Sequence, residues 1–215
     1  MPEIFEHERF STTVANAVLA PVVGEYVGRL GERMAAGGYT EDVLLLHSGG
    51  GVMTGKGAAK FPARLAASGI AAGAIASRFV AQVAGYENSI SLDMGGTSTD
   101  ISLCDRGNLR ITTNWYVEYG YPICFPSIEV LTIGAGGGSI AYVDSAGGFH
   151  VGPRSAGADP GPASYGKGGN QMTTCDANLI CNRIHRDFFM SGTQDPDMKS
   201  VGKAIKPRIY NRYSR

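Results

Sequence analysis

The chain has 215 residues, and 19 lysines and arginines balance 19 aspartates and glutamates, so no overall positive charge is present to attract nucleic acid or a membrane. Its composition, 43% hydrophobic and 18% charged, is typical of a folded protein and excludes general disorder. No apolar run reaches the roughly 18 residues that a transmembrane helix needs. The acidic N-terminus differs from a secretory signal, and the four cysteines form no C-x-x-C pair, so we expect a cytoplasmic location with reduced thiols.

The first predicted element is a helix over residues 11–36, where apolar side chains recur at steps of three and four residues. Ser11 or Thr12 is the expected N-cap. Pro21 lies inside the pattern and should kink or divide the helix, because proline has no backbone N–H. A glycine pair beginning at Gly37 should end it. We assign no chemistry to this segment.

A short apolar run at residues 43–47 predicts a strand that is buried on both faces. It leads into a glycine loop at residues 48–51, and such a loop at the carboxyl end of a buried strand is a common ligand position in α/β folds. The glycines alone are a weak signal. His47 has two interpretations, a structural one, which is favoured, and a ligand contact or acid/base group.

An alanine-rich helix is predicted from about Ser68 to Ala84. Its small residues make a thin face that lets another element approach closely. An anion site at its N-terminus, where N–H groups are free, is the alternative interpretation of Ser68 and Gly69. The sequence does not separate the two.

The central stretch of the chain, residues 89–117, predicts three consecutive strands. Apolar and polar residues alternate over 89–94, a glycine turn follows, and a second strand leads to a tight turn at 105–108. The third strand is predicted over 109–117, where β-branched and aromatic residues are frequent.

The glycine turn carries the groups that a nucleotide phosphate needs. Two adjacent glycines let backbone N–H groups approach an anion, and the hydroxyl residues after them add donors. An aspartate on either side would repel phosphate unless a cation such as Mg²⁺ lies between them. A plain hairpin is the less favoured alternative. The candidate residues are Asp93, Gly95, Gly96, Thr97, Ser98 and Asp100.

Two later segments have open interpretations. The aromatic residues of 115–126 would contact a substrate or partner subunit, or would pin an irregular loop to the core; Pro122 and Pro126 exclude a central strand. The glycine cluster at 132–139 precedes a strand at 140–143, which is the order of neither a Walker loop nor a dinucleotide fingerprint. It is either an anion nest or a bend packed under another element.

Residues 151–165 form a long predicted loop in which Arg154 either grips a phosphate or carboxylate or makes a surface ion pair. Asp176 is predicted to cap a helix over 177–184.

Residues 93–100 resemble a phosphate loop of the actin/Hsp70/sugar-kinase ATPase superfamily and, more narrowly, of the hydantoinase A/oxoprolinase family. Residues 115–130 and 68–73 most resemble the ATP-binding subunit of acetone carboxylase and its acetophenone carboxylase relatives. The resemblance covers about residues 8–190. Further segments that agree with the family are residues 10–17, 132–141, 152–162 and 176–179.

The resemblance implies an α/β fold with an RNase H-like core, of which one lobe is present. We expect a helical N-terminal segment at 1–42, an ATPase lobe at 43–190 and a basic, solvated or disordered tail at 191–215. Proteins of the family are several times longer and carry a second phosphate loop. The chain is therefore expected to be a fragment, a truncated product or a separate half-subunit.

The implied function is part of an ATP-dependent ketone carboxylase that binds Mg-ATP and activates its small-molecule substrate by phosphoryl transfer. A cyclic-amide hydrolase of the hydantoinase or oxoprolinase type and a non-catalytic assembly lobe are the alternatives. The implied partners are other carboxylase subunits or the missing ATPase lobe.

The resemblance also implies roles for the loop residues. Asp93 would bind Mg²⁺ through water or orient the attacking oxygen, and Asp100 would support the metal site indirectly. The phosphate cradle would consist of Gly95, Gly96 and Thr97. The further candidates for nucleotide contacts are Ser98, Gly136, Gly137 and Gly50.

Overall fold

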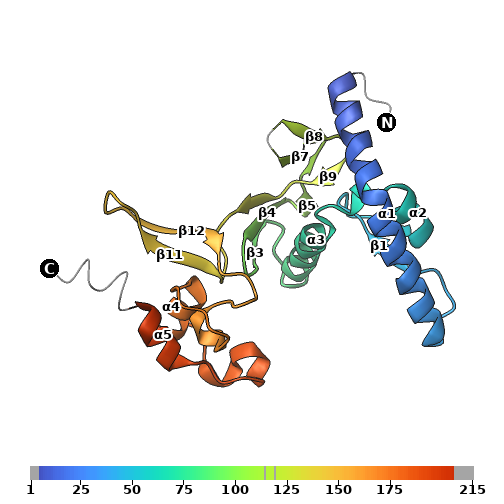
Figure 1. The fold of residues 1–215 in the computed structure, drawn as a ribbon. Coiled ribbons are helices and arrows are strands. Elements are labelled where there is room, and N and C mark those ends of the chain that lie inside the picture. Colours follow the sequence, from blue (N-terminus) through green and yellow to red (C-terminus); the bar gives the residue numbers. More distant parts are fainter. Residues whose placement is uncertain (1–4, 114, 119, 206–215) are drawn as a thin grey trace. The chain divides into compact units, whose positions relative to one another are not determined.

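The computed structural model describes residues 5–113, 115–118 and 120–205 (Figure 1). Helices and strands both occur throughout, so the predicted mixed α/β class is confirmed. The chain divides into two compact units. Unit 1 is Met1–Ser91 with Ile101–Leu131, and unit 2 is Leu92–Asp100 with Thr132–Arg215. Among the described helices, none has the length and apolar character required to cross a membrane.

Unit 1 begins with the long helix α1 (Glu6–Ala36). It starts earlier than predicted, with Phe5 as the N-cap, so the expected hydroxyl N-cap is wrong. Thr12 lies inside the helix and donates its Oγ1 hydrogen to the carbonyl of Glu8 (2.9 Å). Acidic residues in the first turn favour this earlier start. The helix is not divided at Pro21, because the turns on both sides stay helical. The predicted end is confirmed, since Gly37 is the C-cap.

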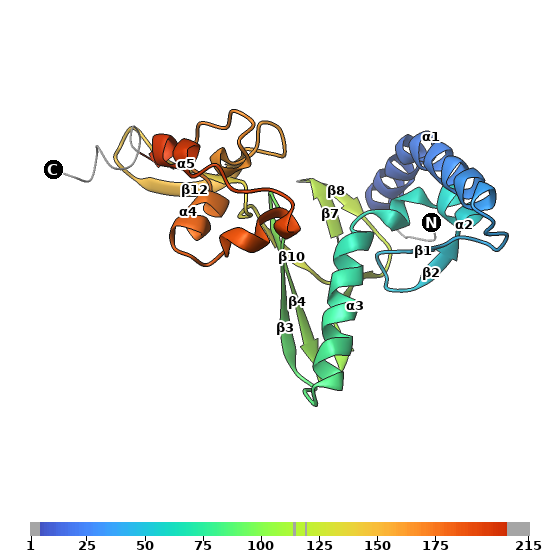
Figure 2. The same ribbon diagram turned by 90° about the horizontal axis from the view of Figure 1, so that it is seen from below.

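A row of apolar side chains on α1 is exposed within unit 1. These residues are spaced four apart, which places them on one side of the helix. The helix packs against α2 (Gly55–Lys60), η1 (Pro62–Leu65) and β8 (Tyr121–Ile123), as Figure 2 shows for α2. The exposed row consists of Phe10, Val14, Val18, Val22 and Tyr26.

The predicted buried strand is β1 (Leu44–Leu46), which pairs antiparallel with β2 (Val52–Thr54). The prediction of burial on both faces is wrong, because β1 belongs to a two-stranded ribbon and Leu44 is 59% exposed. Helix α2 follows directly, capped by the Thr54 side chain.

Helix α3 (Ser68–Val83) agrees with the predicted helix to within one residue. Its small side chains do allow close packing, because Ala71 and Ala74 are buried against Ile128. The N-cap, Ala67, makes no side-chain hydrogen bond.

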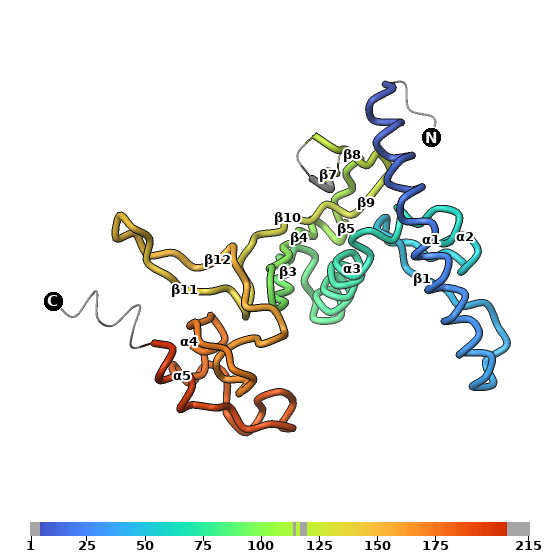
Figure 3. Tube along the Cα trace, in the orientation of Figure 1, coloured from blue at the N-terminus to red at the C-terminus, as the bar shows by residue number. Residues whose placement is uncertain are grey.

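The predicted hairpin is confirmed as β3 (Ser89–Met94) and β4 (Thr99–Asp105), and β4 lies between β3 and β10 (Leu131–Ile133). The predicted single third strand is wrong. That stretch divides into three short strands because each piece pairs with a different partner: β5 with β4, β6 with β9 and β7 with β8. Figure 3 labels β7 and β8 side by side. Their bounds are β5 (Asn108–Leu109), β6 (Ile111–Thr112), β7 (Trp115–Glu118) and β9 (Ser127–Ile128).

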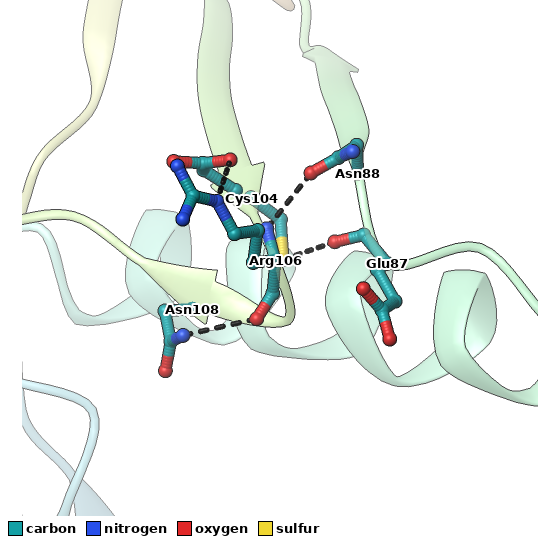
Figure 4. Close-up of polar contacts among 6 residues, drawn as sticks. Glu87, Asn88, Cys104, Arg106 and Asn108 are labelled. Atoms are coloured by element: carbon teal, nitrogen blue, oxygen red, sulfur yellow. Dashed lines mark hydrogen bonds and ion pairs between the residues drawn. The ribbon is translucent and has the colours of Figure 1, made fainter.

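The tight turn between β4 and β5 forms as predicted (Figure 4). Arg106 and Gly107 both have positive φ angles, 47° and 75°, as a two-residue hairpin turn with right-handed strand twist requires. The segment before β3 fixes the turn: the Arg106 amide donates to Asn88 Oδ1 (2.8 Å) and the Cys104 thiol to the Glu87 carbonyl (3.6 Å).

The alternation along β3 is real, but its apolar side is the open one. Ile90, Leu92 and Met94 are 69%, 70% and 56% exposed. On the other side, the hydroxyls of Ser91 and Ser102 form a hydrogen bond of 2.5 Å.

Unit 2 contains the antiparallel pair β11 (Ser139–Val143) and β12 (Phe149–Ser155), which confirms the strand predicted after the glycine cluster. The predicted helix at 177–184 is corrected: α4 begins at Thr174, and Thr173 rather than Asp176 is its N-cap. Part of the predicted solvated or disordered tail forms helix α5, whose Val201 is 1% exposed and therefore packs in the core. Residues 206–215 of that tail lie outside the described residues. The other elements are η2 (Ala163–Tyr165), α4 (Thr174–Ile180), η3 (Arg186–Gly192) and α5 (Met198–Ile205).

The turn between β11 and β12 gives a pH prediction. Asp144 accepts hydrogen bonds from the His150 ring (2.7 Å) and from the amides of Gly148 (2.8 Å) and Ala146 (2.9 Å). These bonds, led by that from His150, hold the pKa of Asp144 below its ordinary value of 3.8. Because the folded-state pKa is lowered, the stabilisation is present above pH 3.8 and is lost as the pH falls through the folded-state pKa. An NMR titration of the Gly148 amide should therefore show a midpoint below 3.8. A midpoint at or above that value would contradict the geometry.

Candidate functional site

The predicted phosphate loop lies in unit 2 and connects β3 to β4. The amide of Gly95 donates to the carbonyl of Ser98 (2.9 Å), which closes the turn. Gly95, Gly96 and Thr97 are exposed, and a Cβ atom added at Gly96 would meet nothing within 4 Å. The outer side of the loop is therefore open to a ligand.

Backbone donors are available on this loop. Within the described part of the chain, the amides of Gly96 and Thr97 have no hydrogen-bond acceptor. An exposed amide without a protein acceptor is free to donate to an anion, and two in succession make a concave donor site. The Thr97 hydroxyl, which donates a long hydrogen bond to Ser155 Oγ (3.5 Å), is a third donor on the loop.

The glycine cluster lies against the loop, so the structure brings Gly136 and Gly137 together with the predicted phosphate contacts. The Gly137 amide donates to the Gly95 carbonyl (2.9 Å), and the Gly138 amide donates to the Gly96 carbonyl (2.6 Å). A Cβ atom at Gly136 would lie 2.7 Å from the backbone of Gly96 and Thr97. Only a residue without a side chain allows two backbones to approach this closely.

The amides of the cluster are already committed to the protein. Gly136 donates to Ser139 Oγ (2.8 Å), and Gly137 and Gly138 donate to the loop. These bonds favour the interpretation of a bend packed under another element over that of an anion nest. The cluster therefore packs against the loop and fixes its backbone conformation.

The two predicted carboxylates have different surroundings. Asp93 is exposed, and among the described residues no side-chain hydrogen bond or ion pair to its carboxylate occurs. Asp100 is half-buried and accepts a hydrogen bond from Thr132 Oγ1 (2.5 Å) on β10. Next to it, the buried Thr99 donates its hydroxyl hydrogen to the Ala135 carbonyl (2.5 Å). The Asp93 side chain is thus open to solvent, whereas Asp100 joins β4 to β10.

The donor set suits a magnesium ion carried by a phosphate. In the described part of the chain, no group of three His, Cys, Asp or Glu side chains is placed to hold a metal by itself. Magnesium usually keeps several waters and takes one or two carboxylates together with substrate phosphates. The exposed Asp93 and the open amides of Gly96 and Thr97 lie within five consecutive residues, and these groups would suit that arrangement.

Ser155 contacts the loop, and the sequence did not reveal this. Its hydroxyl lies 3.5 Å from both Thr97 Oγ1 and the Gly96 carbonyl, and it accepts the Gly157 amide (3.1 Å). Its place in the family-like segment 152–162 was the available signal. Arg154 on the same strand is exposed and has no ion pair among the described residues, so its role stays open.

Gly50 belongs to unit 1, separate from the loop residues of unit 2. It lies in the turn between β1 and β2 with a φ of +86°, and its amide donates to the His47 carbonyl (2.9 Å). The His47 ring accepts the Gly49 amide (3.0 Å), and burial together with the nearby Arg64 charge lowers its pKa. These contacts favour the structural interpretation of His47.

A buried carboxylate supports the loop indirectly. Asp176 is 0% exposed and accepts hydrogen bonds from the amides of Ser164 (2.9 Å) and Ala163 (3.3 Å). It also accepts the amide (2.9 Å) and hydroxyl (2.8 Å) of Thr173, which completes a capping box. The first turn of α4, held in this way, lets the Cys175 amide donate to the Gly137 carbonyl (2.7 Å).

Comparison with known proteins adds independent evidence. The family model described as hydantoinase/oxoprolinase matches residues 9–210. Caprolactamase subunit alpha of Pseudomonas jessenii is 40% identical over 211 residues, which are 97% of this chain and 30% of that protein. The acetophenone carboxylase gamma subunit of Aromatoleum aromaticum is 34% identical over 209 residues, 96% of this chain and 28% of that protein.

The fold has a counterpart among solved structures. Nucleotide-free acetone carboxylase superposes with a TM-score of 0.84 at 26% identity, over 98% of this chain and 29% of that chain. The chain thus spans less than a third of the length of these relatives. Because the family model matches nearly the whole sequence, the chain belongs to the hydantoinase/oxoprolinase family.

Proposed function

We propose that this chain is part of an ATP-dependent ketone carboxylase that binds Mg-ATP at the loop of residues 93–100 and activates its substrate by phosphoryl transfer. The observation that carries the proposal is the loop itself, which presents free amides and an exposed carboxylate on a backbone held rigid from behind. Phosphoryl transfer depends mainly on positioning and charge stabilisation, which such a loop supplies.

Each loop residue has a role in this proposal. The amides of Gly96 and Thr97 and the Thr97 hydroxyl donate to the terminal phosphate oxygens. Asp93 binds water molecules of the metal or orients the attacking substrate oxygen. Magnesium would offset the repulsion between Asp93 and the phosphates. Asp100, bonded to Thr132, keeps the start of β4 in place and acts on the metal site only indirectly.

The proposed substrate is a ketone, whose enolate oxygen receives the phosphoryl group, with bicarbonate as the source of the carboxyl group. A cyclic amide is the second candidate. Its support is the identity to the caprolactamase subunit, which is 40%, against 34% to the acetophenone carboxylase subunit. Both candidates share one step, the activation of an oxygen by ATP.

We further propose that residues 43–190 are one RNase H-like lobe and that a second lobe or other subunits complete the enzyme. Support comes from the share of the relatives that the chain spans, 30% and 28%, and from their names, which describe subunits. A non-catalytic assembly lobe would fit the same lengths, and turnover separates the two.

Exchange into complete relatives tests the proposal. The chain would replace the matched segment of the caprolactamase subunit alpha and, separately, of the acetophenone carboxylase gamma subunit. We expect substrate-dependent ATP hydrolysis in both hybrids, with more activity restored in the carboxylase hybrid. The Asp93→Asn substitution should abolish this hydrolysis, and the exposed control Asp105→Asn should not. Fuller restoration in the caprolactamase would favour the cyclic amide. Folded hybrids that assemble without turnover would replace the enzyme proposal with the assembly lobe.

A further inference from the structure

A cavity of about 240 Å³ lies in unit 1 between α1 and the segment that contains η1. It shares no residue with the phosphate loop. Phe61 and Phe125 supply apolar walls, Thr13 and Asn16 come from α1, and Arg64 supplies a positive charge. The cavity thus combines one cation with aromatic surface.

The Arg64 guanidinium is held by the two aromatic rings. Its Cζ atom lies 5.8 Å from the ring centre of Phe61 and 5.9 Å from that of Phe125. Within the described part of the chain, no carboxylate forms an ion pair with Arg64. The planar guanidinium is therefore oriented by its neighbours while its charge and N–H groups stay available.

The backbone that carries Arg64 is fixed from two sides. The Arg64 carbonyl accepts the amide (2.8 Å) and the hydroxyl (2.9 Å) of Ser48. Asn16 accepts the Ala63 amide (3.3 Å) and donates to the Lys60 carbonyl (3.2 Å). The cavity wall is thus built before any ligand arrives, which lowers the entropy cost of binding.

The local charge favours an anion. The Lys60 ammonium lies 5.4 Å from the ring centre of Phe61, so a second cation lies near the cavity although it does not line it. The α1 side contributes hydroxyls and an amide but no carboxylate. The Thr12 and Thr13 hydroxyls already donate to helix carbonyls, which leaves Arg64 to provide the strong donors.

We propose that this cavity binds a small carboxylate with a short apolar tail. The carboxylate would pair with the fork of N–H groups on Arg64, a geometry that arginine and carboxylate share. The tail would lie against Phe61 and Phe125, of which Phe125 is 5% exposed and so forms a fixed surface. A phosphate dianion fits less well, because its oxygens would face apolar walls.

The proposed function suggests where such a ligand arises, and this link alone rests on that function. Carboxylation of a ketone forms a keto acid, and hydrolysis of a cyclic amide forms an amino acid. Each product carries a carboxylate on a short carbon chain. The pocket itself is argued from residues that the nucleotide site does not use.

NMR titration of the ¹⁵N-labelled chain tests the pocket without ATP. Butyrate is the probe, butyramide is its neutral match, and inorganic phosphate is the tailless anion. Butyrate should shift the amide signals of Ala63 and Arg64, and butyramide should not. Arg64→Gln should weaken butyrate binding at least about tenfold, because a charge-assisted hydrogen-bonded pair is lost. Arg29→Gln, which alters an exposed arginine paired with Glu25, should leave it unchanged.

The spectrum of each variant also reports its fold. If Arg64→Gln does not fold, Arg64→Lys replaces it and should still weaken binding, because it keeps the charge and removes the planar fork. Equal shifts with butyramide, equal affinity for phosphate, or unchanged binding by the folded Arg64 variant would overturn the proposal. The nucleotide site can fail its own titration without affecting any of these results.

Discussion

Asp176→Ala is expected to lower the free energy of unfolding of unit 2 by about 3 kcal/mol or more, because buried donors left without an acceptor cost about 1–3 kcal/mol each. The wild-type carboxylate is 0% exposed and accepts four hydrogen bonds, from Ala163, Ser164 and twice from Thr173. Alanine removes all four acceptor contacts and leaves four donors unpaired: the amides of Ala163, Ser164 and Thr173 and the Thr173 hydroxyl. Urea unfolding followed by far-UV circular dichroism measures the change.

The matched control is Asp159→Ala, which changes an exposed aspartate of the same unit and should alter stability by less than about 0.5 kcal/mol. Hydrogen exchange should also rise in α4, because the capping box is lost. A loss below about 1 kcal/mol for Asp176→Ala would show that water replaces the carboxylate, contrary to its burial.

Gly136→Ala is expected to weaken Mg-ATP binding at least about tenfold, with a smaller loss of stability of about 1–3 kcal/mol from overpacking. The added methyl group would lie 2.7 Å from the backbone of Gly96 and Thr97, closer than real Cβ atoms approach other atoms. The loop must move to relieve this contact, and its free amides move with it. Calorimetric titration with Mg-ATP measures the effect.

Gly202→Ala is the control for this substitution, since a Cβ atom at that helical position in α5 meets nothing within 4 Å. It should bind nucleotide like the wild type. Wild-type affinity in a folded Gly136→Ala variant would mean that the close packing of the cluster against the loop does not shape the nucleotide site.

The sequence predicted those elements whose signals are local. Three predicted features depend only on neighbouring residues: the alternation in β3, the turn at Gly95-Gly96 and the turn at Arg106-Gly107. All three appear in the structure. The long helix was predicted for the same reason, although Pro21 proved tolerable within it. Composition and periodicity therefore located most of the central hairpin.

The sequence did not predict which distant residues pair with one another. The packing of Gly136 against Gly96 joins positions 40 residues apart, and no local pattern encodes that contact. The division of the stretch after Leu109 into short strands likewise depends on which partner each piece meets. The open apolar side of β3 shows the same limit, since alternation identifies two faces but not what covers them.

The candidate site shows the same difference between local signals and contacts of distant residues. The residue types around Asp93 predicted a phosphate loop from chemistry alone, whereas the roles of the individual groups came from the family resemblance. The contacts of Asp100 with Thr132 and of Gly137 with Gly95 join distant parts of the chain, and only the fold reveals them. A capping-box pattern, a threonine three residues before Asp176, was present in the sequence as a signal for that residue.

The most direct test of the central claim is calorimetric titration of the chain with Mg-ATP, with Asp93→Asn and the exposed control Asp105→Asn measured alongside. We predict micromolar binding that Asp105→Asn keeps, that Asp93→Asn loses by at least about tenfold, and that removal of magnesium abolishes. Equal binding by the folded Asp93 variant, or no binding by the folded wild-type chain, would contradict a nucleotide site at residues 93–100.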